Sequence, residues 1–273
     1  MQEFKMPIRE QNSHKGTFGK VLNFCGSKNY IGAAYLSTKS SLKVGAGLSA
    51  LASEKQIISS ISAMLPEAIY LTRKEGLDKI NDYSVILIGC GLGQGVGAKN
   101  LLKKVLEKTE DKPLIIDADG LNLLAGITPS PQPSPQREEE IIITPHPLEA
   151  SRLLSCSVEQ VLENLEESAK ELSKKYNCVT VLKTYRTIVC DTDLNIYVNQ
   201  HGNSALAKGG SGDVLAGIIA GLLAQGMQAF EACKLGVYLH SRSGEIASEA
   251  LTEYSVLAND LIDNLSKAIG EII

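Results

Sequence analysis

Residues 203–213 read Asn-Ser-Ala-Leu-Ala-Lys-Gly-Gly-Ser-Gly-Asp, and an apolar run at residues 214–224 follows at once. The glycines predict a loop, and the apolar run predicts a helix that begins beside Asp213. Backbone N–H groups at the start of a helix bind anionic oxygens, and a carboxylate next to them can accept a proton from a hydroxyl. The stretch therefore suits phosphoryl chemistry, although taken alone a glycine turn followed by a helix cap is the more frequent explanation.

Strand-like and helix-like segments alternate along the chain. Short apolar segments predict strands at residues 20–25, 67–71, 85–88, 113–117, 141–144, 178–183, 187–191 and 195–198, of which the last two can form a hairpin. Helical spacing predicts helices at residues 32–43, 98–108, 158–176, 214–225 and 231–247. This alternation predicts an α/β fold with a mostly parallel sheet covered by helices on both faces. Ligands on such sheets bind beyond the carboxyl ends of the strands.

The composition excludes several classes of protein. The 273 residues carry a net charge of −4, which gives no basic footprint for nucleic acid. The six cysteines are dispersed without a metal-binding spacing, so we expect reduced thiols in a cytoplasmic protein. No apolar stretch approaches the ~20 residues of a membrane span, and the first residues lack the apolar core of a signal peptide. We expect no membrane partner.

Residues 128–140 do not fit the pattern of the rest. They contain a tandem Pro-Ser-Pro-Gln followed by an acidic run, a composition from which no core can be built. We interpret this segment as a solvated loop or a disordered insertion in a single domain that spans residues 1–273.

Four further loops carry candidate functional residues. The glycine-rich loop at residues 89–95 is either a tight turn or an anion cradle. Asp117 and Asp119 follow a predicted strand and could hold Mg²⁺ through water or cap the next helix, with neither favoured. His146 lies between two prolines at a strand end, and this rigid mounting favours a substrate contact. Residues 183–187, Lys-Thr-Tyr-Arg-Thr, could contact nucleotide phosphate or ribose, although alone they are typical of an exposed basic turn.

Taken in order, several segments resemble one family closely. They are HKGTFGKVL at 14–22, YIGAAYLSTKSSLKVGAGL at 30–48, GCGLGQ at 89–94, PLIIDADGLNLL at 113–124, ITPHPLEASRLL at 143–154, VLKTYRT at 181–187 and NSALAKGGSGDVLAGIIAGLLAQG at 203–226. The chain resembles the ADP- or ATP-dependent NAD(P)H-hydrate dehydratases. The resemblance implies a ribokinase-like three-layer sandwich, with a central, mostly parallel sheet between helices.

The resemblance also implies the reaction. The nucleotide phosphorylates the C6 hydroxyl of hydrated NADH or NADPH (NADHX or NADPHX), phosphate is eliminated, and the ring double bond returns. It implies Mg²⁺ and ADP or ATP as phosphoryl donor, with Asp213 as the catalytic base. The positions that match the hydrate pocket are Ala33 or Ala34, Gly91, Gly93, His146 and Asp213. The positions that match the nucleotide site are Lys183, Thr184, Tyr185, Arg186, Thr187, Asn203, Gly209, Gly210, Ser211 and Gly212.

The chain departs from the family pattern at several places. Thr184 and Leu148 stand where the family usually has glycine, and the Pro-rich tract looks like an insertion. Many relatives carry an N-terminal epimerase domain, for which about a dozen residues before His14 leave no room, so we expect a separate epimerase protein. Relatives are often tetramers, so we expect a homo-oligomer.

Two other functions compete with this interpretation. A kinase of the same fold that acts on a thiazole or pyrimidine alcohol would use the same glycine loop and keep the phosphate on its product. A nucleotide-binding module without activity is favoured only by Thr184, and Asp213 argues against it. The Pro-His-Pro motif favours the dehydratase over the kinase.

Overall fold

In a computed structural model, residues 4–109, 112–127 and 141–273 are described. In this part of the chain nine strands form one sheet in the order β3-β2-β1-β4-β5-β6-β7-β8-β9. Neighbours from β3 to β7 pair in parallel, and the β7–β8 and β8–β9 pairs are antiparallel. The strands are β1 (Lys20–Phe24), β2 (Leu48–Ser53), β3 (Ile69–Thr72), β4 (Val85–Ile88), β5 (Leu114–Ile116), β6 (Ile141–Ile143), β7 (Val179–Leu182), β8 (Ile188–Cys190) and β9 (Ile196–Val198).

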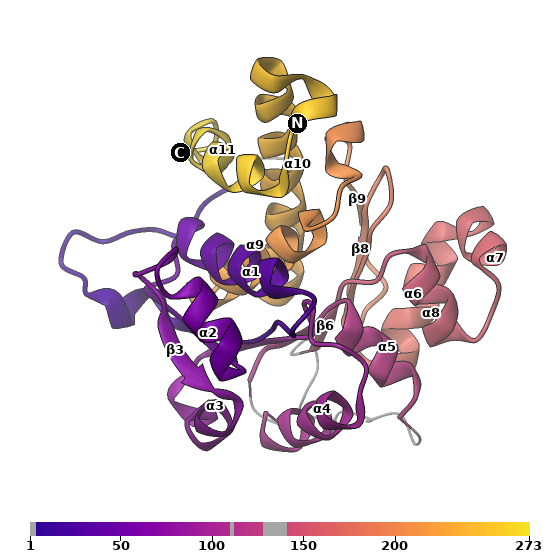
Figure 1. Cartoon of the computed structure of the whole chain (residues 1–273). Coiled ribbons are helices and arrows are strands. Elements are labelled where there is room, and N and C mark those ends of the chain that lie inside the picture. The colour runs from indigo at the N-terminus through magenta and orange to yellow at the C-terminus, as the bar shows by residue number, and fades with distance from the viewer. Residues whose placement is uncertain (1–3, 110–111, 128–140) are drawn as a thin grey trace.

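Helices cover both faces of the sheet (Figure 1). One layer contains α1 (Ile31–Lys43), α2 (Lys55–Ile61), α9 (Ser211–Ala224), α10 (Ala229–Ser255) and α11 (Ala258–Gly270). The other contains α3 (Arg73–Asp78), α4 (Val96–Lys108), α5 (Asp119–Ala125), α6 (Pro147–Leu154), α7 (Val158–Glu163) and α8 (Leu165–Tyr176). Short 3-10 turns are η1 (Lys15–Phe18), η2 (Ile80–Asp82) and η3 (Ser204–Leu206).

The two helical layers enclose two apolar cores. Side chains alternate between the faces of a strand, so Val21 of β1 packs in the core beside α9 while Leu22 packs in the opposite core. Strands buried on both faces carry apolar side chains at nearly every position, which is why β4, Val-Ile-Leu-Ile, was predictable to the residue. The predicted three-layer α/β fold with a mostly parallel sheet is confirmed.

Two glycines let α9 approach α1 very closely. A Cβ atom at Gly217 would lie 2.0 Å from Ser40 Oγ and 2.2 Å from the Ser37 carbonyl oxygen. A Cβ at Gly221 would lie 2.5 Å from the Ser41 carbonyl oxygen. These two glycines therefore bring the backbones of α9 and α1 into close contact, and this contact holds α9 in place against α1.

The structure corrects one predicted helix and adds elements that the sequence did not indicate. Residues 158–176 form two helices, because Asn164 has φ −136° and ψ 56° and interrupts the helical hydrogen bonds between α7 and α8. The strand β2 and the helices α2, α3, α5, α6 and α11 were not predicted. The Pro-rich segment at residues 128–140 lies outside the described residues, so its interpretation stays a prediction.

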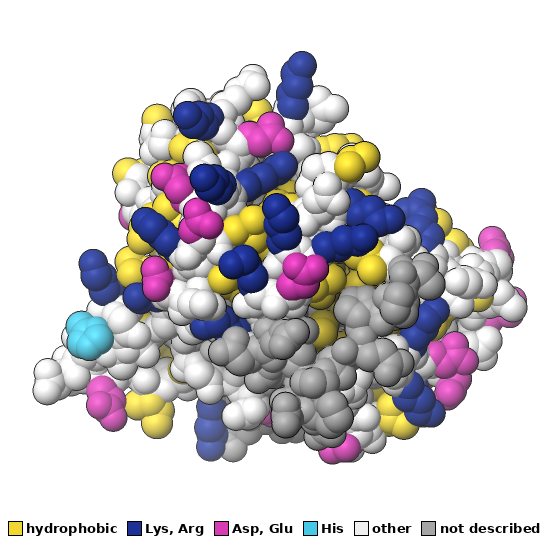
Figure 2. Space-filling view, turned by 90° about the horizontal axis from the view of Figure 1, so that it is seen from below, with side chains coloured by type: hydrophobic (Ala, Val, Ile, Leu, Met, Phe, Trp, Pro, Cys, Tyr) yellow, Lys and Arg dark blue, Asp and Glu magenta, His cyan; other side chains and the backbone are white. Residues whose placement is uncertain are grey.

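The described surface agrees with the composition. On the face in Figure 2, Lys and Arg side chains are interspersed with Asp, Glu and apolar side chains and do not form one basic stripe. All six cysteines are free thiols. Among the described helices, none combines the length and apolar character that crossing a membrane requires.

The contact between α1 and α9 can be tested with two Gly-to-Ala substitutions. We expect Gly217→Ala to lower the unfolding free energy by about 2 kcal/mol or more, because the new methyl overlaps Ser40 and Ser37. The control is Gly97→Ala in α4, where a Cβ meets nothing within 4 Å, and which should be neutral or stabilising by up to about 1 kcal/mol. Thermal unfolding of both variants makes the measurement, and equal midpoints would refute the account of the contact.

Candidate functional site

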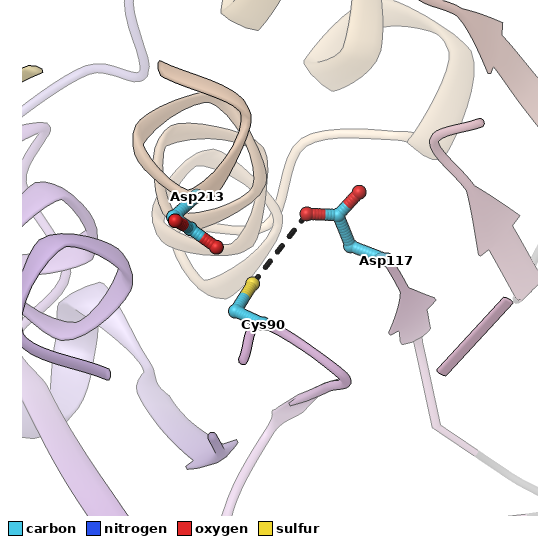
Figure 3. Close-up of side chains that lie close together, drawn as sticks. All are labelled: Cys90, Asp117 and Asp213. Atoms are coloured by element: carbon cyan, nitrogen blue, oxygen red, sulfur yellow. Dashed lines mark hydrogen bonds between the residues drawn. The ribbon is translucent and has the colours of Figure 1, made fainter. Parts of the chain in front are cut away.

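Three side chains, among them the predicted base Asp213 and the candidate Asp117, meet at the carboxyl ends of the parallel strands. Cys90 follows β4, Asp117 follows β5, and Asp213 lies in the first turn of α9 (Figure 3). One side-chain atom from each of these three residues lies within 4.8 Å of the others. Because loops after parallel strands open at one edge of a sheet, residues that are distant in sequence form one cluster there.

The start of α9 is a glycine turn in a left-handed conformation. Gly210 is the N-cap residue, with φ 92° and ψ −17°, a left-handed conformation that favours glycine. A Cβ there would lie 2.6 Å from Leu36 Cδ1. The first N–H groups of any α-helix lack intrahelical partners, so those of the turn after Gly210 can bind phosphoryl oxygens.

Asp213 has the acid–base character that a proton acceptor needs. Burial, and then the neighbouring Asp117 carboxylate, raise the pKa of Asp213 to about 7, against the opposing effects of Lys183 and Cys90. A group that titrates near neutral pH is both ionised in part and basic enough to accept a proton from a hydroxyl. Asp213 is therefore the strongest candidate base among the described residues.

Asp117 is buried and hydrogen-bonded on both carboxylate oxygens. Its Oδ1 accepts hydrogen bonds from Thr144 Oγ1 at 2.6 Å and from Lys183 Nζ at 2.7 Å, and its Oδ2 accepts one from Cys90 Sγ at 3.5 Å. Burial acts to lower the pKa of Lys183, but Asp117 and Glu149 outweigh it and raise the pKa. The ammonium therefore stays charged. Thr144 and Cys90 were not among the predicted site residues.

His146 caps α6 and borders the site. Its Nδ1 accepts hydrogen bonds from the backbone N–H groups of Leu148 and Glu149, at 3.1 and 3.4 Å, and its Nε2 lies 3.3 Å from Glu149 Oε1. Burial and then Lys183 lower the pKa of His146, so the neutral ring carries its proton on Nε2. The capping role is shown by these contacts, and contact with a substrate stays a prediction.

A cavity of about 680 Å³ lies beside the cluster. The predicted nucleotide-site residues that line it are Lys183, Thr184, Tyr185, Thr187, Asn203, Ser211 and Gly212, and His146 joins them. Arg186 instead lines a separate groove near α7 and α8. Gly210 shapes the turn, and neither it nor Gly209 is among the lining residues.

Of the predicted hydrate-pocket residues, His146 lines the cavity, Asp213 belongs to the cluster, and Gly91 directly follows Cys90 in the chain. A Cβ at Gly91 would lie 2.8 Å from Ala33 Cβ, whereas Ala34 is fully buried with its Cβ against Gly26. Of the two alanines that the sequence left open, Ala33 is therefore the neighbour of Gly91. The Gly93 N–H donates to Asp119 Oδ2 at 2.8 Å, so Asp119 anchors the glycine-rich loop.

His240 is a structural support that the sequence did not reveal. Its Nε2 lies 3.0 Å from both the carbonyl oxygen and the Oγ of Ser211. Burial lowers the pKa of His240 to about 4, so the ring is neutral at physiological pH. It lies inside α10, 29 residues from Ser211, where no local sequence signal marks it.

The cluster does not form a dedicated magnesium cage. Mg²⁺ prefers oxygen ligands in an octahedral arrangement. Here Asp117 is already paired with Lys183, and a hydrogen bond with Cys25 and burial raise the pKa of the Cys90 thiol. Asp119 binds the Gly93 N–H, and α5 has no side-chain cap hydrogen bond. Neither aspartate caps α5 with its side chain, and magnesium binding through water stays a prediction.

The chain is similar to known proteins over most of its length. The family model of NAD(P)H-hydrate dehydratases matches residues 21–267. An ADP-dependent (S)-NAD(P)H-hydrate dehydratase from Neisseria meningitidis is 38% identical over 244 residues, which are 89% of this chain and 81% of that protein. A bifunctional NAD(P)H-hydrate repair enzyme from Coxiella burnetii is 38% identical over 263 residues, which are 95% of this chain. The chain spans about half, 52%, of that bifunctional relative.

Solved structures show the same fold. The ADP/ATP-dependent NAD(P)H-hydrate dehydratase from Bacillus subtilis, co-crystallised with ATP/Mg²⁺, superposes with a TM-score of 0.88 at 34% identity and covers 98% of this chain and 95% of its own. A ribokinase-like superfamily protein from Enterococcus faecalis gives 0.87 at 31% identity, covering 98% and 92%. A hydroxyethylthiazole kinase from Pyrococcus horikoshii gives 0.64 at 14% identity, covering 93% and 89%, and shares the fold alone. The fold is ribokinase-like.

The raised pKa of Asp213 predicts that Asp213→Asn stabilises the protein at alkaline pH. A carboxyl whose pKa rises from 3.8 to about 7 on folding destabilises the folded state above pH 7, and this penalty fades as the pH falls towards 4. We expect a gain on the order of 2 kcal/mol at pH 8, since one pKa unit is worth about 1.4 kcal/mol and the side chain is partly open to solvent. Thermal unfolding between pH 4 and pH 8 measures it, and a pH-independent difference from wild type would contradict the prediction.

Proposed function

Because the chain belongs to the NAD(P)H-hydrate dehydratase family, we propose that it converts (6S)-NADHX and NADPHX to NADH and NADPH with ADP or ATP as phosphoryl donor. The observation that carries the proposal is the position of Asp213. It lies in the first turn of α9, beside an anion-binding turn, with its pKa raised to about 7. This arrangement joins a proton acceptor to a phosphoryl site, as the reaction requires.

The proposed reaction has two stages. Asp213 accepts the proton of the C6 hydroxyl, the hydroxyl oxygen bonds to the terminal phosphorus of the nucleotide, and the bond from that phosphorus to AMP or ADP breaks. The C6–O bond then breaks with its electron pair on the phosphate, and loss of a ring proton restores the double bond. Positioning and charge stabilisation by backbone N–H groups provide most of the catalysis in such transfers.

We propose that the nucleotide occupies the 680 Å³ cavity with its phosphates towards Gly212. The Thr184 hydroxyl donates to the Arg186 carbonyl oxygen at 2.8 Å. Thr184, which replaces the usual family glycine, thus forms a hydrogen bond within the loop at residues 183–187. Mg²⁺, present with ATP in the Bacillus subtilis crystals, would arrive bound to the nucleotide phosphates, because Asp117 of the candidate cluster is already paired with Lys183.

The wider setting is also a proposal. The bifunctional relatives, of which this chain spans about half, support a functional pairing with a hydrate epimerase. We propose a cytoplasmic homo-oligomer, most simply a tetramer, built from a single domain that spans the chain. Sedimentation of the purified protein measures the oligomeric state.

The activity is tested by absorbance at 340 nm with chemically prepared NADHX, Mg²⁺ and either ADP or ATP. We expect a nucleotide-dependent rise with AMP or ADP and free phosphate as co-products. Asp213→Asn should retain nucleotide binding and lose turnover by about 10²-fold or more, because it removes the base and leaves the anion site. A folded wild-type protein that gives no rise with either nucleotide would rule out the dehydratase and favour the small-alcohol kinase.

The rate should also depend on the protonation of Asp213. The carboxylate is the active form, so kcat/KM should rise with pH and level off above about pH 7, where the pKa of Asp213 lies. Initial rates between pH 5 and pH 9, corrected for NADHX stability, give the profile. An acid limb near pH 4 would show that the working base is an ordinary exposed carboxyl.

A further inference from the structure

Two carboxylates and one ammonium meet in the cluster. Carboxylate oxygens of Asp117 and Asp213 lie within 4.8 Å of each other and of Cys90 Sγ (Figure 3). The ammonium of Lys183 is bound to Asp117, at 2.7 Å from its Oδ1. A lysine that binds one of two adjacent carboxylates leaves the other without a cation, and this choice separates their acid–base behaviour.

The surroundings of Asp117 explain why the lysine binds there. The Asp117 backbone N–H donates to the Ile88 carbonyl oxygen at 3.1 Å, and its carbonyl oxygen accepts from the Gly120 N–H at 2.9 Å. The side chain is 1% exposed and is also held by Thr144. Asp117 is therefore a fixed anchor, fastened by backbone and side chain at the end of β5.

The anchored ammonium faces the phosphoryl end of the cavity. Lys183 Nζ lies 3.3 Å from the position that a Cβ would take at Gly212, and both residues line the 680 Å³ cavity. The Lys183 backbone N–H donates to the Pro145 carbonyl oxygen at 2.8 Å, which fixes the base of the side chain. An ammonium has three N–H donors, so binding to Asp117 leaves donors for phosphoryl oxygens.

We propose that Asp117 is a positioning residue, which holds the Lys183 ammonium beside Gly212 for the transferred phosphoryl group and so leaves Asp213 unpaired to accept the substrate proton. This inference rests on the proposed function. The titratable groups that act on Asp213 are Asp117 at the end of β5, Lys183 after β7, Cys90 after β4 and Asp119 at the start of α5. Of these four, only Lys183 is a cation.

The central experiment compares two variants that break the same ion pair. In Asp117→Asn the ammonium is free to pair with Asp213, so kcat should fall about 10²-fold while the acid limb of kcat/KM moves to lower pH. In Lys183→Met the unpaired Asp117 carboxylate faces Asp213 alone, so the limb should move to higher pH, with weaker nucleotide binding. If Asp117 and Lys183 only supported the fold, the two substitutions would not shift the acid limb of the kcat/KM profile in opposite directions.

A charge-matched control separates this effect from the loss of any ion pair. Asp263 binds Lys39 Nζ at 3.4 Å on the surface, and Asp263→Asn should leave the rate and the acid limb unchanged. The double variant Asp117→Asn/Lys183→Met should bring the limb back towards the wild-type position. Circular dichroism and thermal unfolding show which variants fold.

A measurement without substrate keeps the inference separate from the proposed function. Carboxyl ¹³C NMR titration reports the pKa of Asp213 directly, with the Asp213→Asn spectrum assigning the resonance. We expect opposite shifts in Asp117→Asn and Lys183→Met. Unshifted resonances in the folded variants would overturn the inference even if wild type dehydrates NADHX, and opposite shifts would support it even if wild type proves to be a kinase.

Discussion

The site depends on how closely α9 approaches α1. Gly217 and Gly221 leave room only for hydrogen atoms against the serine-rich face of α1, and the start of α9 is thereby fixed above the strand ends. His240 holds the same turn from α10 through Ser211. Packing between helices thus places a set of backbone N–H groups and one carboxylate where the parallel strands open. The functional chemistry follows from this placement.

The second constraint is the balance of charge at that edge of the sheet. Asp117, Asp213 and Lys183 are brought together in a region from which water is largely excluded, where each charge changes the behaviour of the others. The pairing of Lys183 with Asp117 stabilises these two charges, while burial and then the Asp117 carboxylate raise the pKa of Asp213 to about 7. The electrostatic cost falls on the Asp213 carboxylate. Because this cost raises its pKa, Asp213 is the carboxylate that can take up a proton.

Sequence patterns predicted the elements whose signals are local. Strands buried on both faces, such as β4, are continuous apolar runs and are predicted from that pattern. The glycine turn before α9 is predicted from its glycine-rich composition. The strand β2, Leu-Ser-Ala-Leu-Ala-Ser, was not predicted because its small and polar residues are not typical of a buried strand. Its Ser49 is buried and hydrogen-bonded to Asn23 of the neighbouring strand β1 and to Ser41 of α1. Hydrogen bonds between residues that are distant in sequence cannot be predicted from a single sequence.

The residues of the candidate site likewise fall into those that the sequence predicted and those that only the structure revealed. The loops that carry Asp213, His146 and Lys183 could be found from their residue types, whereas the partners Thr144 and His240 depend on contacts between distant elements. The two alanines were separable only by structure, because Ala33 faces Gly91 and Ala34 faces Gly26. The break at Asn164, where φ is −136° and ψ is 56°, was likewise not predicted.

In the proposed reaction the hydrate oxygen is phosphorylated before it leaves. The most direct measurement uses NADHX with ¹⁸O in its C6 hydroxyl and follows the label by mass spectrometry of the released phosphate. The account predicts one ¹⁸O atom in each phosphate formed together with NADH, because the C–O bond breaks after the P–O bond has formed. Unlabelled phosphate, with ¹⁸O recovered in water, would contradict the account and show that nucleotide cleavage and dehydration are separate events.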